Sequence, residues 1–162
     1  VDAGAHFLAV MPFWPVAEPG RLLISNGLAT MGYAVPAAIA AGLANPGQPV
    51  LCLVGDGGLG MTAAELETIA RLDLPVTVVV FNDSTLSLIR IKQQTAHGGP
   101  EIVSYRETDF AAIARGFGLR GTVVHDRAGL ARAVVGRWDR PHLIDARIDP
   151  SPYPRLLQLT RG

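Results

Sequence analysis

The residues best suited to chemistry are two aspartates that each follow a short apolar run. Asp56 comes just after Val50–Val54, and Asp83 comes just after Val76–Phe81. Both runs are rich in Val and Leu and lack alternation, which is typical of strands buried on both faces of a parallel sheet. The carboxyl ends of such strands meet at one edge, where open α/β sheets bind ligands. We therefore expect the two carboxylates to face one small space beside glycine backbone, an arrangement that suits a divalent cation held against a phosphate.

The glycine-rich loop after the first run allows two interpretations. Its sequence, Gly55-Asp56-Gly57-Gly58-Leu59-Gly60, matches the dinucleotide pattern G-x-G-x-x-G, and Asp83 follows the next strand. An NAD(P)- or FAD-binding Rossmann domain of an oxidoreductase is therefore one interpretation. Asp56 argues against it, because the position between the first two glycines lies close to the pyrophosphate of a dinucleotide. The Asp56 carboxylate and a phosphate about 4 Å apart would repel by several kcal/mol at a protein-surface dielectric. A cation between them reverses the sign, so Asp56 favours a magnesium–diphosphate site.

The elements that must position these residues alternate between helix and strand. The pattern predicts a three-layer α/β/α fold with a mostly parallel, Rossmann-like sheet. Thr62 and Glu65 have the spacing of a capping box for a helix over 62–72, and Thr108 and Asp126 are expected to cap later helices. Further strands are expected within 1–10 (weak, with His6 near a turn) and at 22–24, 121–124 and 143–146, and further helices over 35–43, 86–94, 110–117 and 126–138.

Domain organisation follows from length and from the distribution of Gly and Pro. The chain has 162 residues, enough for one domain, which we place at 1–149. Residues 150–162 contain three prolines and are expected to form an extended C-terminal tail. His97-Gly98-Gly99-Pro100 is expected to be a flexible break. Because the chain starts at Val1 rather than Met, we expect it to be a piece of a longer protein.

Charge and composition exclude several classes of partner. Lys and Arg together number 14, as do Asp and Glu, so no basic field favours nucleic acid or an anionic membrane. The single cysteine, Cys52, excludes a disulfide framework and fits a cytoplasmic location. Leu28–Ala44 is apolar but too short and interrupted to span a membrane. We expect part of this surface to meet another domain or subunit, and a non-catalytic binding or assembly module is a further alternative.

Two motifs resemble a known family. Gly55-Asp56-Gly57, followed later by Asn82-Asp83, resembles the thiamine-diphosphate motif, in which G-D-G precedes a paired Asn. The block from Gly27 to Ala38 resembles the preceding segment of acetolactate synthases and benzoylformate decarboxylases. Over residues 1–146 the chain is thus similar to the C-terminal, diphosphate-binding (PP) domain of the thiamine-diphosphate-dependent decarboxylase and acetolactate synthase superfamily.

The resemblance implies a role for particular residues. Asp56 and Asp83 would bind Mg²⁺ through their side chains, and Thr85 through its carbonyl. Gly57 and Gly58 would donate N–H groups to the diphosphate, and Met31 would be the apolar wedge that bends the cofactor. The implied cofactor contacts are His6, Ala29 (by its carbonyl), Thr30, Met31, Gly55, Asp56, Gly57, Gly58, Asp83, Thr85 and Leu86. The implied substrate pocket is lined by Leu86, Leu88 and Ile89.

For some of these residues a plainer interpretation stays open. Asp56 or Asp83 could be a turn-forming residue, Met31 a core residue and His6 an ordinary surface or turn histidine. Arg90, like Lys92, would meet either a substrate carboxylate or solvent.

The implied function is that of a 2-oxo acid decarboxylase or carboligase. The activating Glu would lie on a pyrimidine-binding domain of the same or another chain, so this chain alone is expected to be inactive, within a homodimer or homotetramer. Two departures from the family matter. Asp83 is charged where Asn is common, so either Lys92 or His6 offsets the charge or the metal affinity rises. Ile89 replaces the acid of pyruvate decarboxylases, which disfavours simple conversion of pyruvate to acetaldehyde.

Overall fold

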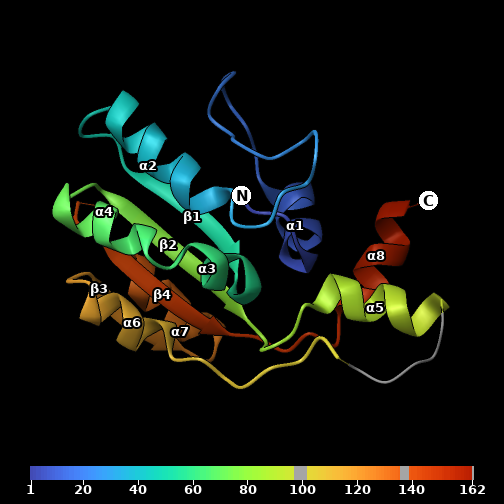
Figure 1. Cartoon of the computed structure of the whole chain (residues 1–162). Helices are drawn as coiled ribbons and strands as arrows, with labels where there is room; N and C mark the ends of the chain where they lie inside the picture. Colours follow the sequence, from blue (N-terminus) through green and yellow to red (C-terminus); the bar gives the residue numbers. More distant parts are fainter. Residues whose placement is uncertain (97–101, 136–138, 162) are drawn as a thin grey trace.

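A four-stranded parallel sheet forms the centre of the molecule (Figure 1). The computed structural model describes residues 1–96, 102–135 and 139–161. The strands are β1 (Val50–Gly55), β2 (Val76–Asn82), β3 (Arg120–Val124) and β4 (His142–Arg147). They run in the order β1-β2-β4-β3, and every neighbouring pair is parallel. The predicted parallel α/β sheet is confirmed.

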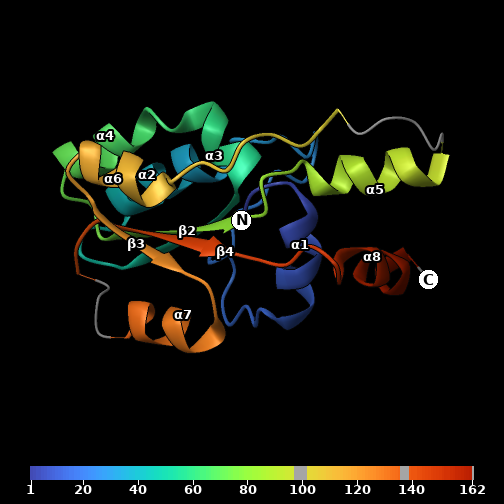
Figure 2. The same ribbon diagram turned by 90° about the horizontal axis from the view of Figure 1, so that it is seen from below.

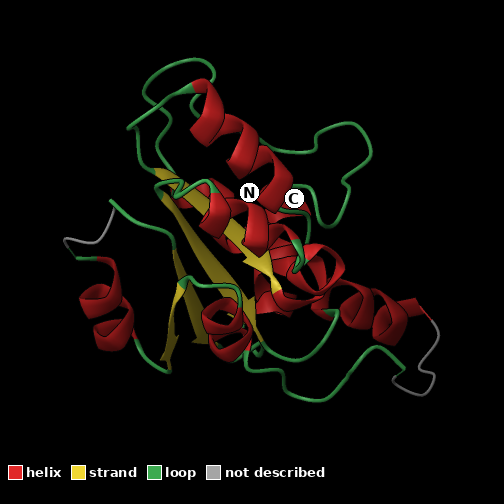
Figure 3. Cartoon of the chain, turned by 60° about the vertical axis from the view of Figure 1, so that its left-hand side comes forward, coloured by secondary structure: helices red, strands yellow, loops and turns green. Residues whose placement is uncertain are grey.

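Helices cover both faces of this sheet, which gives the three layers predicted from the sequence. Figure 2 shows α2, α3, α4 and α6 on one side and α1 and α7 on the other, and Figure 3 shows the same layers by element type. The helices are α1 (Ala5–Val10), the 3-10 turn η1 (Met11–Phe13), α2 (Ala34–Ala44), α3 (Asp56–Thr62), α4 (Glu65–Arg71), α5 (Ser87–Ala96), α6 (Phe110–Gly116), α7 (Arg127–Val134) and α8 (Tyr153–Arg161).

Strand residues divide between two apolar clusters because successive side chains point to opposite faces. Val78 and Val80 pack towards α2, α4 and α6, whereas Val79 and Ile144 pack towards α7. All four are buried, and each fully buried aliphatic side chain contributes about 1.5–3 kcal/mol of transfer free energy. This burial on both faces explains why the runs lack alternation.

The register of β1 and β2 determines where the two aspartates lie. Gly55 pairs with Phe81, so the two strands end at the same edge of the sheet. Asp56 is the first residue of α3, and Asp83 follows the last residue of β2. The expectation that both carboxylates follow neighbouring parallel strands is confirmed.

The N-terminal predictions need correction. The weak strand expected within 1–10 is instead helix α1, which begins after Gly4 and includes His6. Residues 22–24 form no strand either. The N-terminus nevertheless lies beside β1, because the Asp2 N–H donates to the Leu53 carbonyl (2.8 Å), and residues 22–24 lie beside the N-terminus, because the Val1 amine donates to the Leu23 carbonyl (2.9 Å).

The helix expected over 62–72 is shorter than predicted, because Thr62 is the last residue of α3 and α4 spans only Glu65–Arg71, and its capping box is wrong. The Thr62 hydroxyl donates to the Gly58 carbonyl one turn earlier (3.3 Å), so it is not free to cap α4. Ala64 precedes α4 without a side-chain cap. Helix α3 begins within the glycine loop, at Asp56.

Two further helix boundaries differ from prediction. Asp109 rather than Thr108 caps α6, accepting a hydrogen bond from the Ala112 N–H (2.8 Å). Asp126 caps α7 as predicted, with its carboxylate accepting from the Gly129 N–H (2.6 Å). Helix α7 ends at Val134, and both Trp138 and the break expected at 97–100 lie outside the described residues.

The C-terminal segment is helical rather than extended. Helix α8 places Tyr153 against α1 and α5, where its side chain is buried. Pro154 lies in the first turn of α8, where a missing N–H breaks no helical hydrogen bond. Within the described ranges, no helix combines the length and apolarity that crossing a membrane requires.

Candidate functional site

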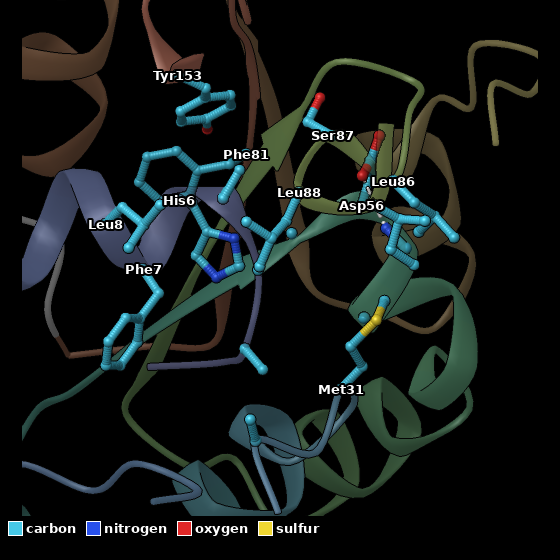
Figure 4. Close-up of a pocket in the computed structure, with 18 of the residues that line it drawn as sticks. His6, Phe7, Leu8, Met31, Asp56, Phe81, Leu86, Ser87, Leu88 and Tyr153 are labelled. Atoms are coloured by element: carbon cyan, nitrogen blue, oxygen red, sulfur yellow. Dashed lines mark hydrogen bonds between the residues drawn. The ribbon is translucent and has the colours of Figure 1, made fainter. Parts of the chain in front are cut away.

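A cavity of about 400 Å³ opens where β1 and β2 end (Figure 4). It brings together most of the residues singled out from the sequence, namely His6, Ala29, Met31, Gly55, Asp56, Gly57, Gly58, Asp83, Thr85, Leu86, Leu88 and Ile89. Thr30 is not on its lining; the Thr30 N–H donates to the Ser25 hydroxyl (3.0 Å) and thus supports the turn that carries Ala29. The placement of these residues is observed, whereas their roles remain predictions.

Asp56 is held by hydrogen bonds from two directions. Its Oδ1 accepts from the Gly57 N–H (2.7 Å), and its Oδ2 accepts from the Ser84 N–H (2.7 Å). Burial raises the pKa of this carboxyl, as does the charge of Asp83, while the hydrogen bond from the Tyr105 hydroxyl lowers it. The carboxylate is thus fixed in orientation in a place where its charge is poorly solvated, which favours an approaching cation.

Asp83 forms a local turn and also lines the cavity. Its Oδ1 accepts from the Thr85 N–H (3.1 Å), and its Oδ2 accepts from the Ser87 hydroxyl (2.6 Å). This is the turn geometry considered as the plainer interpretation. Burial raises the pKa of the Asp83 carboxyl, against the effect of Ser87. Turn formation and cation binding are compatible, since a carboxylate has about four lone-pair sites.

The donor set around these carboxylates suits a hard cation. Within the described ranges, no three or more His, Cys, Asp or Glu side chains are grouped as a metal site. Mg²⁺ commonly takes one or two carboxylates and completes its shell with phosphate oxygens and water. Asp56, Asp83 and the Thr85 carbonyl are of that type, although the Thr85 carbonyl also accepts from the Ser87 N–H (2.8 Å).

Gly57 lies at the base of a cradle that a larger residue would fill. A Cβ at this position would collide with Leu86 and would lie 3.2 Å from Met31 Cε and 3.3 Å from the Tyr105 hydroxyl. Met31 therefore reaches over the glycine loop, as a wedge requires, instead of being buried in the core. The Gly57 N–H, expected to donate to the diphosphate, already donates to Asp56 Oδ1.

His6 is a buried, uncharged histidine on the cavity wall. Its ring stacks on Phe81 (centroids 5.3 Å apart, 23° between planes) and lies against Gly55. Burial lowers its pKa to about 4, so the ring is neutral near pH 7. A neutral His6 would add no charge to offset that of Asp83, whereas the charge of Arg90 lowers the pKa of the Asp83 carboxyl and Lys92 lines the same cavity. His6 Nε2 is buried and makes no hydrogen bond to any residue that the structure describes.

Several residues of the site were missed from the sequence. Tyr105 reaches the glycine loop from the segment before α6, and Tyr153 reaches the cavity from α8. Burial raises the pKa of both phenols, so both stay protonated hydroxyl donors. Phe7 and Leu8 of α1 add apolar lining (Figure 4). A signal existed for Tyr153, because the apolar residues of its segment recur at helical spacing.

The residues predicted to line the substrate side lie at the start of α5, with Leu86 just before the helix and Leu88 and Ile89 in its first turn. Leu86 and Leu88 are half-buried in the cavity wall, and the Ile89 side chain is 40% exposed. All three are apolar, so this wall offers no acid at the position of Ile89.

Known proteins match this chain in both sequence and structure. The family model described as "Thiamine pyrophosphate enzyme, C-terminal TPP binding domain" matches residues 2–146. Acetolactate synthase of Bacillus subtilis (strain 168) is 35% identical over 152 residues, covering 93% of this chain and 27% of that protein. Acetolactate synthase isozyme 1 large subunit of Escherichia coli (strain K12) is 36% identical over 152 residues, covering 91% of this chain and 27% of that protein.

A solved structure agrees with these relatives. The thiamine diphosphate-dependent 4-hydroxybenzoylformate decarboxylase of Rhodococcus jostii RHA1 superposes with a TM-score of 0.70 at 29% identity, covering 75% of this chain and 24% of that one. The chain thus spans about a quarter of the length of the proteins it matches.

Proposed function

Since this chain belongs to the thiamine pyrophosphate enzymes, as their C-terminal TPP-binding domain, we propose that it anchors thiamine diphosphate and Mg²⁺ in a 2-oxo acid decarboxylase or an acetolactate synthase-like carboligase. The observation that carries this proposal is the pair Asp56 and Asp83 beside the Gly57 cradle, at the ends of neighbouring strands. The family match supports it over a nicotinamide- or flavin-binding Rossmann domain.

The residues of the cavity fit both groups. Asp56, Asp83 and the Thr85 carbonyl would hold Mg²⁺ against the diphosphate, which removes the repulsion between carboxylates and phosphate. The buried His6 Nε2, when it carries the ring proton, would donate a hydrogen bond to a phosphate oxygen without adding charge. When bound, the cofactor supplies the electron sink that decarboxylation of a 2-oxo acid requires.

The remaining lining residues position the organic part of the cofactor and keep water out. Met31 and Leu86 would support the rings above Gly57, and the Ala29 carbonyl would accept a hydrogen bond from the aminopyrimidine. Ala29 has a positive φ of 47°, so the turn holds this carbonyl in a conformation that non-glycine residues rarely adopt. Leu88 and Ile89 would form an apolar wall against which a carboxylate is poorly solvated, which favours loss of CO₂.

The complete enzyme needs parts that this chain does not supply. We propose that the activating Glu lies on a pyrimidine-binding domain of the same or another chain, in a homodimer or homotetramer, and that this domain alone does not turn over. Exposed apolar side chains support such a neighbour: Leu28 is 90% exposed and Met61 62% exposed. The short coverage of the relatives supports it as well.

Activity of the full-length protein tests the proposal. We expect CO₂ release from a 2-oxo acid that requires both thiamine diphosphate and Mg²⁺. Tight binding of a nicotinamide cofactor without metal would support the oxidoreductase alternative instead. Binding of neither cofactor by the full-length protein would support a non-catalytic assembly module.

A further inference from the structure

Asp2 is a fully buried carboxylate whose side chain binds backbone N–H groups. Its Oδ2 accepts from the Gly32 N–H (2.9 Å), and its Oδ1 accepts from the N–H groups of Tyr33 (2.9 Å) and Ala34 (3.2 Å). These groups form the turn directly after Met31 and the start of α2. Hydrogen bonds to an ionised carboxylate are about twice as strong as neutral ones, and the helix N-terminus favours a negative charge.

Asp2 also contacts strand β1 and the glycine loop. Its backbone N–H donates to the Leu53 carbonyl of β1 (2.8 Å), just before the glycine loop. Its Oδ2 occupies the space that a Cβ on Gly58 would need, so only glycine fits there. One side chain therefore joins β1, the glycine loop and the turn after Met31.

The turn at Gly32 is further restricted by its backbone conformation and by its packing. Gly32 has a positive φ of 80°, and a Cβ on it would lie 3.1 Å from Thr62 Cγ2 of α3. The turn is thus packed against the helix that begins at Asp56. Because an unpaired buried carboxylate is costly, Asp2 holds the turn in the one arrangement that satisfies it.

We propose that Asp2 is a positioning residue that sets the distance between the Met31 wedge and the diphosphate-binding loop. This inference rests on the proposed function. By fixing Gly32, Tyr33 and Ala34 against Gly58, Asp2 presents Met31 to the rings of the cofactor while the diphosphate is held at Gly57 and Asp56. Its effect on the cofactor is indirect and acts on the rings more than on the phosphates.

Asp2→Asn in the full-length protein tests the proposal by comparing two ligands. The Asn side chain keeps the shape but turns an N–H₂ towards one of the backbone donors. Calorimetry with Mg²⁺ should show thiamine diphosphate bound about tenfold more weakly or worse, since one buried donor is left unpaired. Inorganic pyrophosphate, which has no rings to meet Met31, should keep its affinity within about twofold. An equal loss for both ligands, or no loss, would overturn the proposal.

A matched control separates positioning from general stability. Asp126→Asn weakens an exposed carboxylate cap, which accepts the Gly129 N–H on α7 and lies outside the cavity lining. It should lower the Tm and leave the affinity for thiamine diphosphate unchanged. If the wild-type protein itself binds no thiamine diphosphate, the proposed function fails, whereas normal binding by Asp2→Asn refutes only the role of Asp2.

Hydrogen exchange gives a second test that needs no variant. In the wild-type protein without cofactor, the amides of Gly32, Tyr33 and Ala34 should exchange as slowly as those of β1 and β2, because a buried carboxylate holds them. Fast exchange of all three amides would show that Asp2 does not fix the turn, and would overturn the proposal even if Asp2→Asn does not fold.

Discussion

The Ser84 N–H donates a hydrogen bond of 2.7 Å to Asp56 Oδ2, and this bond links the ends of two neighbouring strands. Ser84 follows Asp83 and has a positive φ of 56°, a conformation that turns its N–H towards β1. The carboxylate of Asp56 is therefore oriented before any cation arrives. Such preorganisation means that binding a metal does not require the loop to be ordered at the same time.

The charge of Asp83 should matter less than its oxygen atoms. Asp83→Asn keeps an oxygen ligand for Mg²⁺ and removes one of two neighbouring negative charges. We expect Mg²⁺-dependent binding of thiamine diphosphate to persist, with its affinity changed by less than about tenfold, which is about 1.4 kcal/mol. Asp83→Ala removes the ligand and the turn to Ser87, and should lose binding. Calorimetry on both variants decides, and equal binding by Asp83→Ala would exclude Asp83 as a ligand.

Gly57→Ala should block the site without unfolding the domain. The new methyl group would displace the flexible end of Leu86 and crowd Met31 and the Tyr105 hydroxyl. We expect the cofactor affinity to fall at least about tenfold, because the methyl group occupies space in the cavity, and we expect only a small change in Tm. Gly60→Ala is the matched control in the same helix, since nothing lies within 4 Å of its Cβ.

The Gly60→Ala control should be slightly more stable than the wild type, by about 0.5–1 kcal/mol, because Ala has a higher helix propensity than Gly. Its cofactor affinity should equal that of the wild type. If Gly57→Ala also binds the cofactor normally, the cradle described above is not where the cofactor lies.

Tyr105→Phe should weaken metal binding although Tyr105 is not a proposed ligand. Its hydroxyl hydrogen-bonds to Asp56 and helps to orient that carboxylate. Loss of a group that orients a metal ligand typically costs about 10- to 100-fold in metal affinity. Titration of Mg²⁺ at saturating thiamine diphosphate measures this. Unchanged Mg²⁺ affinity would mean that Gly57 and Ser84 orient Asp56 without Tyr105.

Buried His6 should make the stability of the cofactor-free protein depend on pH. Its pKa is lowered from 6.5 to about 4, so between these values the unfolded chain binds a proton that the folded protein does not. The stability contributed by neutral His6 is therefore present above about pH 6.5 and is lost as the pH falls towards 4. The loss is on the order of 3 kcal/mol, at about 1.4 kcal/mol per pH unit.

Asp56 and Asp83 act in the opposite direction, because their raised pKa values favour the protonated folded state at low pH. The comparison of wild type with His6→Gln isolates the histidine. Denaturant unfolding from pH 7 to 4 should show a shallower loss of stability in His6→Gln. The exposed His125→Gln variant should keep the wild-type slope. Identical slopes for wild type and His6→Gln would show that His6 is not buried neutral.

The sequence predicts the centre of this fold well because its signals there are local. Apolar runs without alternation mark β1 and β2, and the glycine loop marks their shared edge, so Asp56 and Asp83 are placed together from spacing alone. Asp126 likewise caps the helix that follows it, because capping needs only neighbouring residues.

The parts that depend on distant contacts escape prediction. Tyr105 reaches Asp56 from a segment with no periodic pattern, and Asp2 acts on N–H groups beyond Met31 that carry no sequence signature. Helix α1 has only six residues, too few for helix and strand periods to be told apart, so the sequence predicts a weak strand with His6 near a turn. The three prolines of residues 150–162 predict an extended tail instead of α8, although Pro154 lies in the first turn of that helix, where proline is tolerated.

The most direct test is a calorimetric titration of the full-length protein with thiamine diphosphate, with Mg²⁺ and then with a chelator in its place. We expect binding in Mg²⁺ and none in the chelator, and we expect Asp56→Ala to show no binding under either condition. Binding that is equally tight without metal, or that survives in Asp56→Ala, would contradict the claim that a cation held by Asp56 joins this domain to its cofactor.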